Sequence, residues 1–125
     1  MGASFWKKPG LYIANSPVFA ADSVGTPLLM MHTTNDRIVF LTQGEELYNA
    51  LVHLEKKVWF LQYDREDHLL FDQQHQLDYS MRMAQFFDHY LKGALPPKWM
   101  TVLNTTRGNV NGYTGLDLDS TGGKP

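Results

Sequence analysis

Cysteine is absent from this chain of 125 residues. A disulfide framework, a thiolate nucleophile and a cysteine-bound metal are therefore excluded, and nothing in the composition indicates a redox compartment or a localisation. No apolar run approaches the roughly 20 residues that span a bilayer. The formal net charge is −2, with acids and bases interspersed, so there is no basic stripe for a nucleic acid or a membrane surface. We therefore expect no nucleic acid and no membrane among its partners.

A second absence concerns the nucleophile of serine hydrolases. The motif Gly-x-Ser-x-Gly, which exposes a serine on a sharp strand-to-helix turn, does not occur. The chain has five serines, none in a predicted turn of this kind: Ser4, Ser16, Ser23, Ser80 and Ser120. Any serine chemistry would need a nucleophile from other sequence, so we interpret the chain as the tail of a larger enzyme.

The residues that are present predict a folded α/β unit. A hydrophobic content of 43%, with 13% aromatics, is sufficient for one modest core. Two apolar runs, 26–34 and 58–63, predict buried strands, and the continuous apolar character of 28–31 is typical of a strand covered on both faces. A helix between two such strands makes a βαβ unit, so we expect the strands to be parallel.

Two amphipathic helices are predicted. Thr42 and Glu45 have the spacing of a capping box, which predicts a helix beginning there. Its apolar stripe consists of Leu47, Ala50, Leu51 and Leu54. A second helix of about 18 residues follows, with Gly93 as its left-handed stop. We expect its apolar stripe to face the core: Leu77, Met81, Ala84, Phe87 and Leu91.

The predicted architecture is therefore α/β, a βαβα unit with two parallel strands and two main helices over residues 1–100. Residues 101–125 hold five of the ten glycines and predict an irregular tail. Trp59, Phe60 and Phe87 are expected in the core. His32, at the end of a strand, is interpreted as structural.

Asp36 and His68 are the most informative polar residues. Each stands in a loop directly after one of the predicted strands, and loops at the carboxyl edge of a parallel sheet converge on one crevice. A histidine can act as a base near neutral pH, and a carboxylate on its Nδ1 fixes the tautomer. Two solvated loop side chains are the alternative interpretation on spacing alone.

A metal site is a weaker hypothesis. His68, Asp72 and His75, together with Asp64 and Asp67, are possible ligands, but the one-face helical spacing His-x-x-x-His is missing. Carboxylates are common on solvated loops. We therefore expect no metal and no cofactor.

The stretch from Ser4 to Met100 resembles the C-terminal part of a serine peptidase of the prolyl oligopeptidase family, in its dipeptidyl-peptidase-like branch. The resemblance is carried by residues 12–19 (YIANSPVF), 26–32 (TPLLMMH), 35–39 (Asn-Asp-x-x-Val), 63–68 (YDREDH) and 86–93 (FFDHYLKG). It implies an α/β-hydrolase catalytic domain that hydrolyses short peptides without a cofactor. Asp36 matches the triad aspartate and His68 the triad histidine, with the serine in earlier sequence.

Three positions depart from the family pattern. Thr33 and Glu55 stand where members commonly have glycine or another turn residue, and Leu69 replaces a small or polar residue after the histidine. Two alternatives therefore stay open. One is a non-catalytic structural or interaction module of the same fold, which forms homo-oligomers through its exposed sheet edges. The other is the tail of an α/β-hydrolase esterase.

Overall fold

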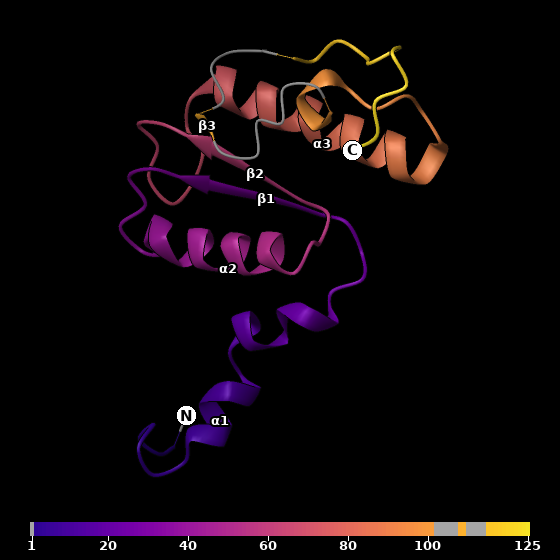
Figure 1. Cartoon of the computed structure of the whole chain (residues 1–125). Helices are drawn as coiled ribbons and strands as arrows, with labels where there is room; N and C mark the ends of the chain where they lie inside the picture. Colours follow the sequence, from indigo (N-terminus) through magenta and orange to yellow (C-terminus); the bar gives the residue numbers. More distant parts are fainter. Residues whose placement is uncertain (1, 102–107, 110–114) are drawn as a thin grey trace.

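The chain folds as a small parallel sheet with a helix on each face (Figure 1). The computed structural model describes residues 2–101, 108–109 and 115–125. The α-helices are α1 (Pro9–Ala14), α2 (Leu41–His53) and α3 (Gln73–Lys92), and the strands are β1 (Leu28–Thr33), β2 (Val58–Tyr63) and β3 (Gly108–Asn109). Two 3-10 helices, Pro17–Ser23 and Lys98–Met100, complete the elements. The mixed α/β class predicted from the sequence is confirmed, as a portion of an α/β-hydrolase fold.

The strand order is β1-β2-β3, with β2 in the middle. β1 and β2 are parallel over their whole length, from Leu28 opposite Val58 to Thr33 opposite Tyr63. The predicted βαβ unit is thus correct, including the ends of the second strand. β3 adds only two residues, paired parallel to β2 at Leu61 and Gln62.

Successive side chains of β2 point to opposite faces of the sheet and fill two separate cores. Val58 and Phe60 pack with Tyr48 and Leu51 of α2. Trp59, Leu61 and Tyr63 pack on the other face, with Phe86 of α3 and with Trp99 and Met100. Figure 1 shows α2 and α3 on opposite sides of the strands. Because both faces are covered, the strand sequence is apolar except for Gln62.

The N-terminal end of α2 differs from the expected capping, whereas its C-terminal end lies where the sequence predicts it. The helix begins at Leu41, one residue before the predicted cap, and no side chain caps it. The capping-box prediction is wrong because Phe40 already has the extended backbone of an N-cap residue, which places Thr42 inside the first turn. At the C-terminal end, the Lys56 N–H donates to the Leu51 carbonyl and Glu55 has a φ of 55°. This is a Schellman motif with glutamate in the left-handed position.

Helix α3 is capped at both ends. Asp72 accepts hydrogen bonds from the N–H groups of Gln74 and His75, and Gly93 ends the helix at a φ of 69°. The glycine stop is therefore confirmed. At 20 residues the helix is slightly longer than predicted.

The face that α3 buries was predicted wrongly. Leu77, Met81, Phe87 and Leu91 are between 42 and 77% exposed, and Ala84 is exposed too. The helix instead buries Asp78, Arg82 and Phe86 against the sheet. Burial of the two charges is possible because they pair with each other and because the Tyr63 hydroxyl donates to Asp78 at 2.7 Å. Trp59 and Phe60 are core residues as expected, whereas Phe87 is not.

The segments flanking this unit are less regular. α1 buries no residue and extends away from the sheet (Figure 1). Residues 102–107 and 110–114 of the predicted irregular tail lie outside the described residues. In its described part, the buried Asp119 carboxylate accepts hydrogen bonds from Thr101 and Thr121, which fixes the chain there. No helix in the described ranges has both the length and the apolar character of a membrane span.

Candidate active site

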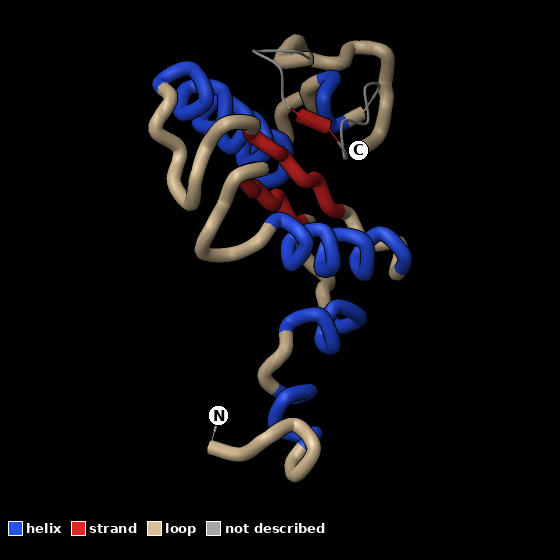
Figure 2. Tube along the Cα trace, turned by 90° about the vertical axis from the view of Figure 1, so that its left-hand side faces the viewer, coloured by secondary structure: helices blue, strands red, loops and turns tan. Residues whose placement is uncertain are grey.

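The loops after β1 and β2 lie side by side at the carboxyl edge of the sheet, where Figure 2 shows them leaving the strands together. The structure brings the two predicted site residues into contact: Nδ1 of His68 lies 2.9 Å from Oδ2 of Asp36. This is hydrogen-bond distance between residues 32 positions apart in the sequence. The parallel register of β1 and β2 produces the contact, because it ends both strands at the same level.

Asp36 divides its two carboxylate oxygens between backbone and histidine. Oδ1 accepts from the N–H groups of Ile38, at 2.9 Å, and Val39, at 2.8 Å. This local turn holds the side chain against its own loop and leaves Oδ2 for His68. Asp36 is buried, and burial alone would raise the pKa of its carboxyl. The hydrogen bonds from Val39, His68 and Ile38 outweigh burial and lower the pKa to about 2.

The ionised carboxylate determines which ring nitrogen of His68 carries the proton. A carboxylate can only accept, so Nδ1 of His68 must be the donor in this contact. In the neutral ring, Nε2 then has the free lone pair and can accept a proton. The His68 side chain is 44% exposed, so this nitrogen is accessible at the edge of the loop. The pair therefore has the arrangement of an oriented general base.

A second histidine stands near the same carboxylate. Nε2 of His32 lies 3.9 Å from Oδ2 of Asp36, and Nδ1 of His32 lies 2.9 Å from the Thr33 N–H. At 3.9 Å the Nε2 contact is too long for a hydrogen bond. Nδ1 also lies 2.9 Å from the Thr33 carbonyl oxygen, so it donates to that carbonyl when it carries the proton and accepts from the Thr33 amide when it does not. This contact with the Thr33 backbone agrees with the structural role predicted for His32.

Arg37 and Asp67 join the two loops beside this pair. Oδ1 of Asp67 accepts from the Arg37 N–H at 3.1 Å and from the His68 N–H at 2.9 Å. Oδ2 accepts from the Arg37 guanidinium through Nε, at 2.7 Å, and through Nη2. The guanidinium, followed by the Arg37 amide, lowers the pKa of the Asp67 carboxyl. From the sequence, Asp67 was expected only as a possible metal ligand. The available signal was that Arg37 follows Asp36 and Asp67 precedes His68, so converging loops bring the pair together.

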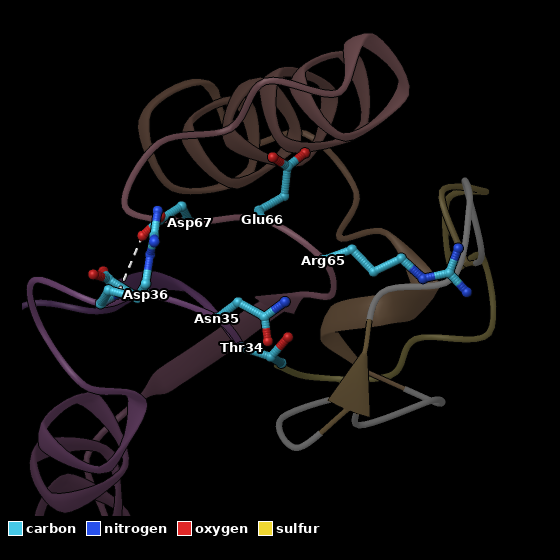
Figure 3. A pocket seen from close by; sticks show the side chains of 7 residues that line it. Thr34, Asn35, Asp36, Arg65, Glu66 and Asp67 are labelled. Carbon is cyan, nitrogen blue, oxygen red and sulfur yellow. Dashed lines mark hydrogen bonds and ion pairs between the residues drawn. The ribbon is translucent and has the colours of Figure 1, made fainter.

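Glu66 organises the rest of the histidine loop. This buried carboxylate accepts from the N–H groups of Phe71 and Asp72, each at 2.9 Å, and from Nδ1 of His75 at 2.8 Å. Burial acts to raise the pKa of Glu66, but these hydrogen bonds lower it overall. Figure 3 shows Glu66 pointing toward α3, away from Asp36.

Four of the five residues considered as metal ligands have other partners, His68 among them through Asp36. Asp72 caps α3, His75 pairs with Glu66, and Asp67 pairs with Arg37. Within residues 2–101, 108–109 and 115–125, no group of three or more His, Asp or Glu side chains is placed to hold a metal ion.

Two open cavities flank the pair. A polar cavity of about 590 Å³ is bounded by the loops around Asp36 and Asp67, and within it Arg65 points away from both carboxylates (Figure 3). Arg65 has a φ of 62°, which is uncommon for a residue with a side chain. A second, apolar cavity of about 520 Å³ adjoins His68 and is lined by Arg37, Ile38, Asp67, His68, Leu69 and Phe71.

Residues 1–94 match the family model described as the prolyl oligopeptidase family. The chain belongs to this family. The match supports a peptidase-family origin and hydrolase character for the sequence. No curated protein matches the chain.

The three departures from the prolyl oligopeptidase pattern have distinct surroundings. Thr33 is buried, and its hydroxyl donates to the backbone carbonyl of Asp67, so it adds a link between the two loops. Glu55 occupies a left-handed position at the far end of α2. Leu69 is largely exposed and lines the apolar cavity beside His68. None of the three side chains separates Asp36 from His68.

Proposed function

We propose that Asp36 and His68 are the acid and base of a Ser-His-Asp triad in a serine peptidase that hydrolyses short peptides. The nucleophilic serine would come from sequence outside the 125 residues. The observation that carries the proposal is the 2.9 Å contact between His68 Nδ1 and Asp36 Oδ2 in a member of the prolyl oligopeptidase family. This contact leaves Nε2 of His68 accessible for proton transfer.

In the proposed reaction, His68 Nε2 removes the proton from the serine hydroxyl as the oxygen attacks the scissile carbonyl. The resulting imidazolium gives that proton to the leaving amine, and an acyl-enzyme forms. Water then attacks the acyl carbonyl as Nε2 takes one of its protons, the ester bond to the serine breaks, the peptide acid is released, and the proton returns to the serine oxygen. Asp36 stays ionised throughout, as its lowered pKa favours, and stabilises the imidazolium.

The five serines of the chain do not supply the nucleophile in this proposal. Ser80 lies within α3, where its hydroxyl donates to the Gln76 carbonyl. Ser23 ends the 3-10 helix Pro17–Ser23, and Ser4, Ser16 and Ser120 lie outside helices and strands. None of the five stands on a turn between a strand and a helix. The isolated chain is therefore expected to be inactive. It should also not react covalently with a fluorophosphonate probe.

The decisive experiment uses the protein encoded by the reading frame extended upstream of Met1, if that sequence supplies Gly-x-Ser-x-Gly. The unaltered protein should be labelled by the fluorophosphonate and should cleave short chromogenic peptides. Asp36→Asn should reduce kcat by about 10⁴-fold and His68→Gln by about 10⁶-fold. His53→Gln changes an exposed histidine at the end of α2 and should leave kcat unchanged.

Three results would reject the proposal. Full activity of the His68→Gln variant would show that His68 is not the base. Cleavage of acyl esters without cleavage of peptides would indicate an esterase instead. An extended reading frame without a serine on a strand-to-helix turn, in a protein that forms defined complexes, would favour the interaction module.

A further inference from the structure

We propose that Asp67 is a positioning residue, which aligns His68 with Asp36 by tying the base loop to the acid loop. The inference rests on the proposed function, because alignment matters only if the pair transfers protons. It extends that function to a residue outside the triad. The observations that carry it are the hydrogen bonds that a single carboxylate makes to both loops.

One oxygen of Asp67 joins the two loops. Oδ1 accepts from the backbone N–H of Arg37, the residue after Asp36, and from the backbone N–H of His68 itself. Both N–H groups therefore converge on a single atom. This fixes the distance between the backbone at Arg37, next to Asp36, and the backbone at His68. The Thr33 hydroxyl adds a third link, because it donates to the Asp67 carbonyl.

The second oxygen of Asp67 has a different role. Among the residues that the structure describes, Oδ2 accepts only from the guanidinium of Arg37, whose side chain is 86% exposed, whereas the Asp67 side chain is 30% exposed. An ion pair with so exposed a partner is screened by water and contributes little by itself. The backbone hydrogen bonds of Oδ1 should therefore carry most of the positioning, and the guanidinium should mainly orient the carboxylate.

This division predicts a graded series of variants. Asp67→Ala removes both oxygens, so His68 should lose its fixed position. Asp67→Asn keeps one oxygen for the two N–H groups and loses only the contact with the guanidinium. Arg37→Ala keeps both oxygens but loses the same contact. The last two variants should therefore behave alike, and combining them should add little to either.

The experiment follows the low-field proton signal of His68 Nδ1–H in the 125-residue chain by NMR. Its exchange with water should become roughly tenfold faster in Asp67→Ala, since loss of a charged acceptor weakens the local hydrogen bonds. In Asp67→Asn and Arg37→Ala it should change less than about threefold. Asp36→Ala, which removes the acceptor itself, is the positive control.

A matched control removes a different ion pair of the same type. Asp88→Ala abolishes the contact with Lys92 on α3, at 3.1 Å, and should leave the His68 signal unchanged. The backbone amides of β1 and β2 report the stability of the whole fold. They should exchange equally fast in Asp67→Ala and in the unaltered chain, which separates positioning from a general structural effect.

An unchanged Nδ1–H exchange rate in Asp67→Ala would overturn the inference. So would an increase matched by the sheet amides. If Asp67→Ala does not fold, the exchange rates of the Arg37 and His68 amides in the unaltered chain decide the question. Both amides should exchange with water more slowly than the amide of the exposed Asn35. Exchange as fast as that of Asn35 would overturn the proposal.

Activity assays of the extended, serine-bearing protein separate this inference from the proposed function. Asp67→Ala should lower kcat with little change in KM, and Asp67→Asn should restore most of it. Full activity of His68→Gln would reject the proposed function, while the NMR series would still measure the link between the loops. Loss of activity in His68→Gln, with full kcat in Asp67→Ala, would reject only the positioning role.

Discussion

The helices α2 and α3 cover opposite faces of the same strand with different chemistry. α2 buries Tyr48 and Leu51 against Val58 and Phe60, an apolar contact of the expected kind. α3 packs a buried ion pair, Asp78 with Arg82, against the sheet, together with Phe86, and Asp78 accepts from the Tyr63 hydroxyl. The comparison shows that helical periodicity locates a helix, but the residues that face it determine which of its stripes is buried.

The largest effect is expected on the α3 side, from Asp78→Ala. The Asp78 and Arg82 side chains are 3 and 2% exposed, so the substitution removes the carboxylate with which the buried Arg82 guanidinium forms its ion pair. The free energy of unfolding should fall by about 3–5 kcal/mol, measured by urea denaturation. Replacing the network together, with Asp78→Leu, Arg82→Met and Tyr63→Phe, should cost much less. An equal loss in the triple variant would show that the charges themselves are required.

Leu51→Ala is the matching test on the α2 side. Leu51 is fully buried in the apolar core, and truncation leaves a cavity. We expect a loss of about 3 kcal/mol in the free energy of unfolding. Val52→Ala, at an exposed position of the same helix, should change it by less than about 0.5 kcal/mol. Equal losses at the two positions would contradict the burial pattern of α2.

These two cases also show how far the sequence predicted the fold. The β2 strand, the parallel pairing and the stop at Gly93 were predicted because apolar runs and glycine are strong local signals. The buried stripe of α3 was not predicted. Asp78 and Arg82 have the sequence pattern of solvent-facing residues, and their burial is explained only by their pairing with each other and with Tyr63. A hydropathy pattern contains no information about pairing across 15 residues, the separation of Tyr63 and Asp78.

The candidate site shows the same limit. Asp36 and His68 could be placed at one sheet edge from strand order alone, and the family resemblance supplied their expected roles. For Asp67, its place directly before His68 indicated that it lies near Arg37, but its hydrogen bonds to the N–H groups of Arg37 and His68 depend on the exact approach of two loops. Glu66 was missed for a related reason, since two of its three partners are backbone N–H groups that carry no sequence signal.

A third prediction sharpens the comparison through pH. Burial, followed by the hydrogen bond to Asp78, raises the pKa of the Tyr63 hydroxyl far above its usual value. In the unfolded chain this group loses its proton near pH 10, while in the folded chain it stays protonated. Its contribution to stability is therefore complete below about pH 10 and is lost as the pH rises further.

The free energy of unfolding should then fall above pH 10 by at most about 1.4 kcal/mol per pH unit from this group. Tyr63→Phe should remove that part of the slope, so the two curves should converge between pH 8 and 11.5. Unfolding followed by circular dichroism at several pH values measures this. Parallel curves would mean that Tyr63 ionises as readily in the fold as outside it.

The helix ends provide a smaller test. α3 ends on Gly93, whereas α2 ends on Glu55 with a φ of 55°, a conformation that costs a residue with a side chain about 1 kcal/mol. Glu55→Gly should therefore raise the free energy of unfolding by up to about 1 kcal/mol. Glu46→Gly, the same substitution at an exposed position within α2, should lower it by about the same amount. Thermal unfolding of both variants checks the sign, and a loss in each would remove the conformational argument.

The smallest effect should come from the exposed stripe of α3. Leu91 is 77% exposed, so Leu91→Gln should change the free energy of unfolding by less than about 0.5 kcal/mol, measured in urea at low protein concentration. Phe86→Ala, on the buried face of the same helix, should cost about 3–5 kcal/mol by comparison. A loss above 1 kcal/mol for Leu91→Gln would mean that another surface covers this stripe in solution. Light scattering would then identify a second copy as that surface if the measured mass were twice that of the chain and the substitution halved it.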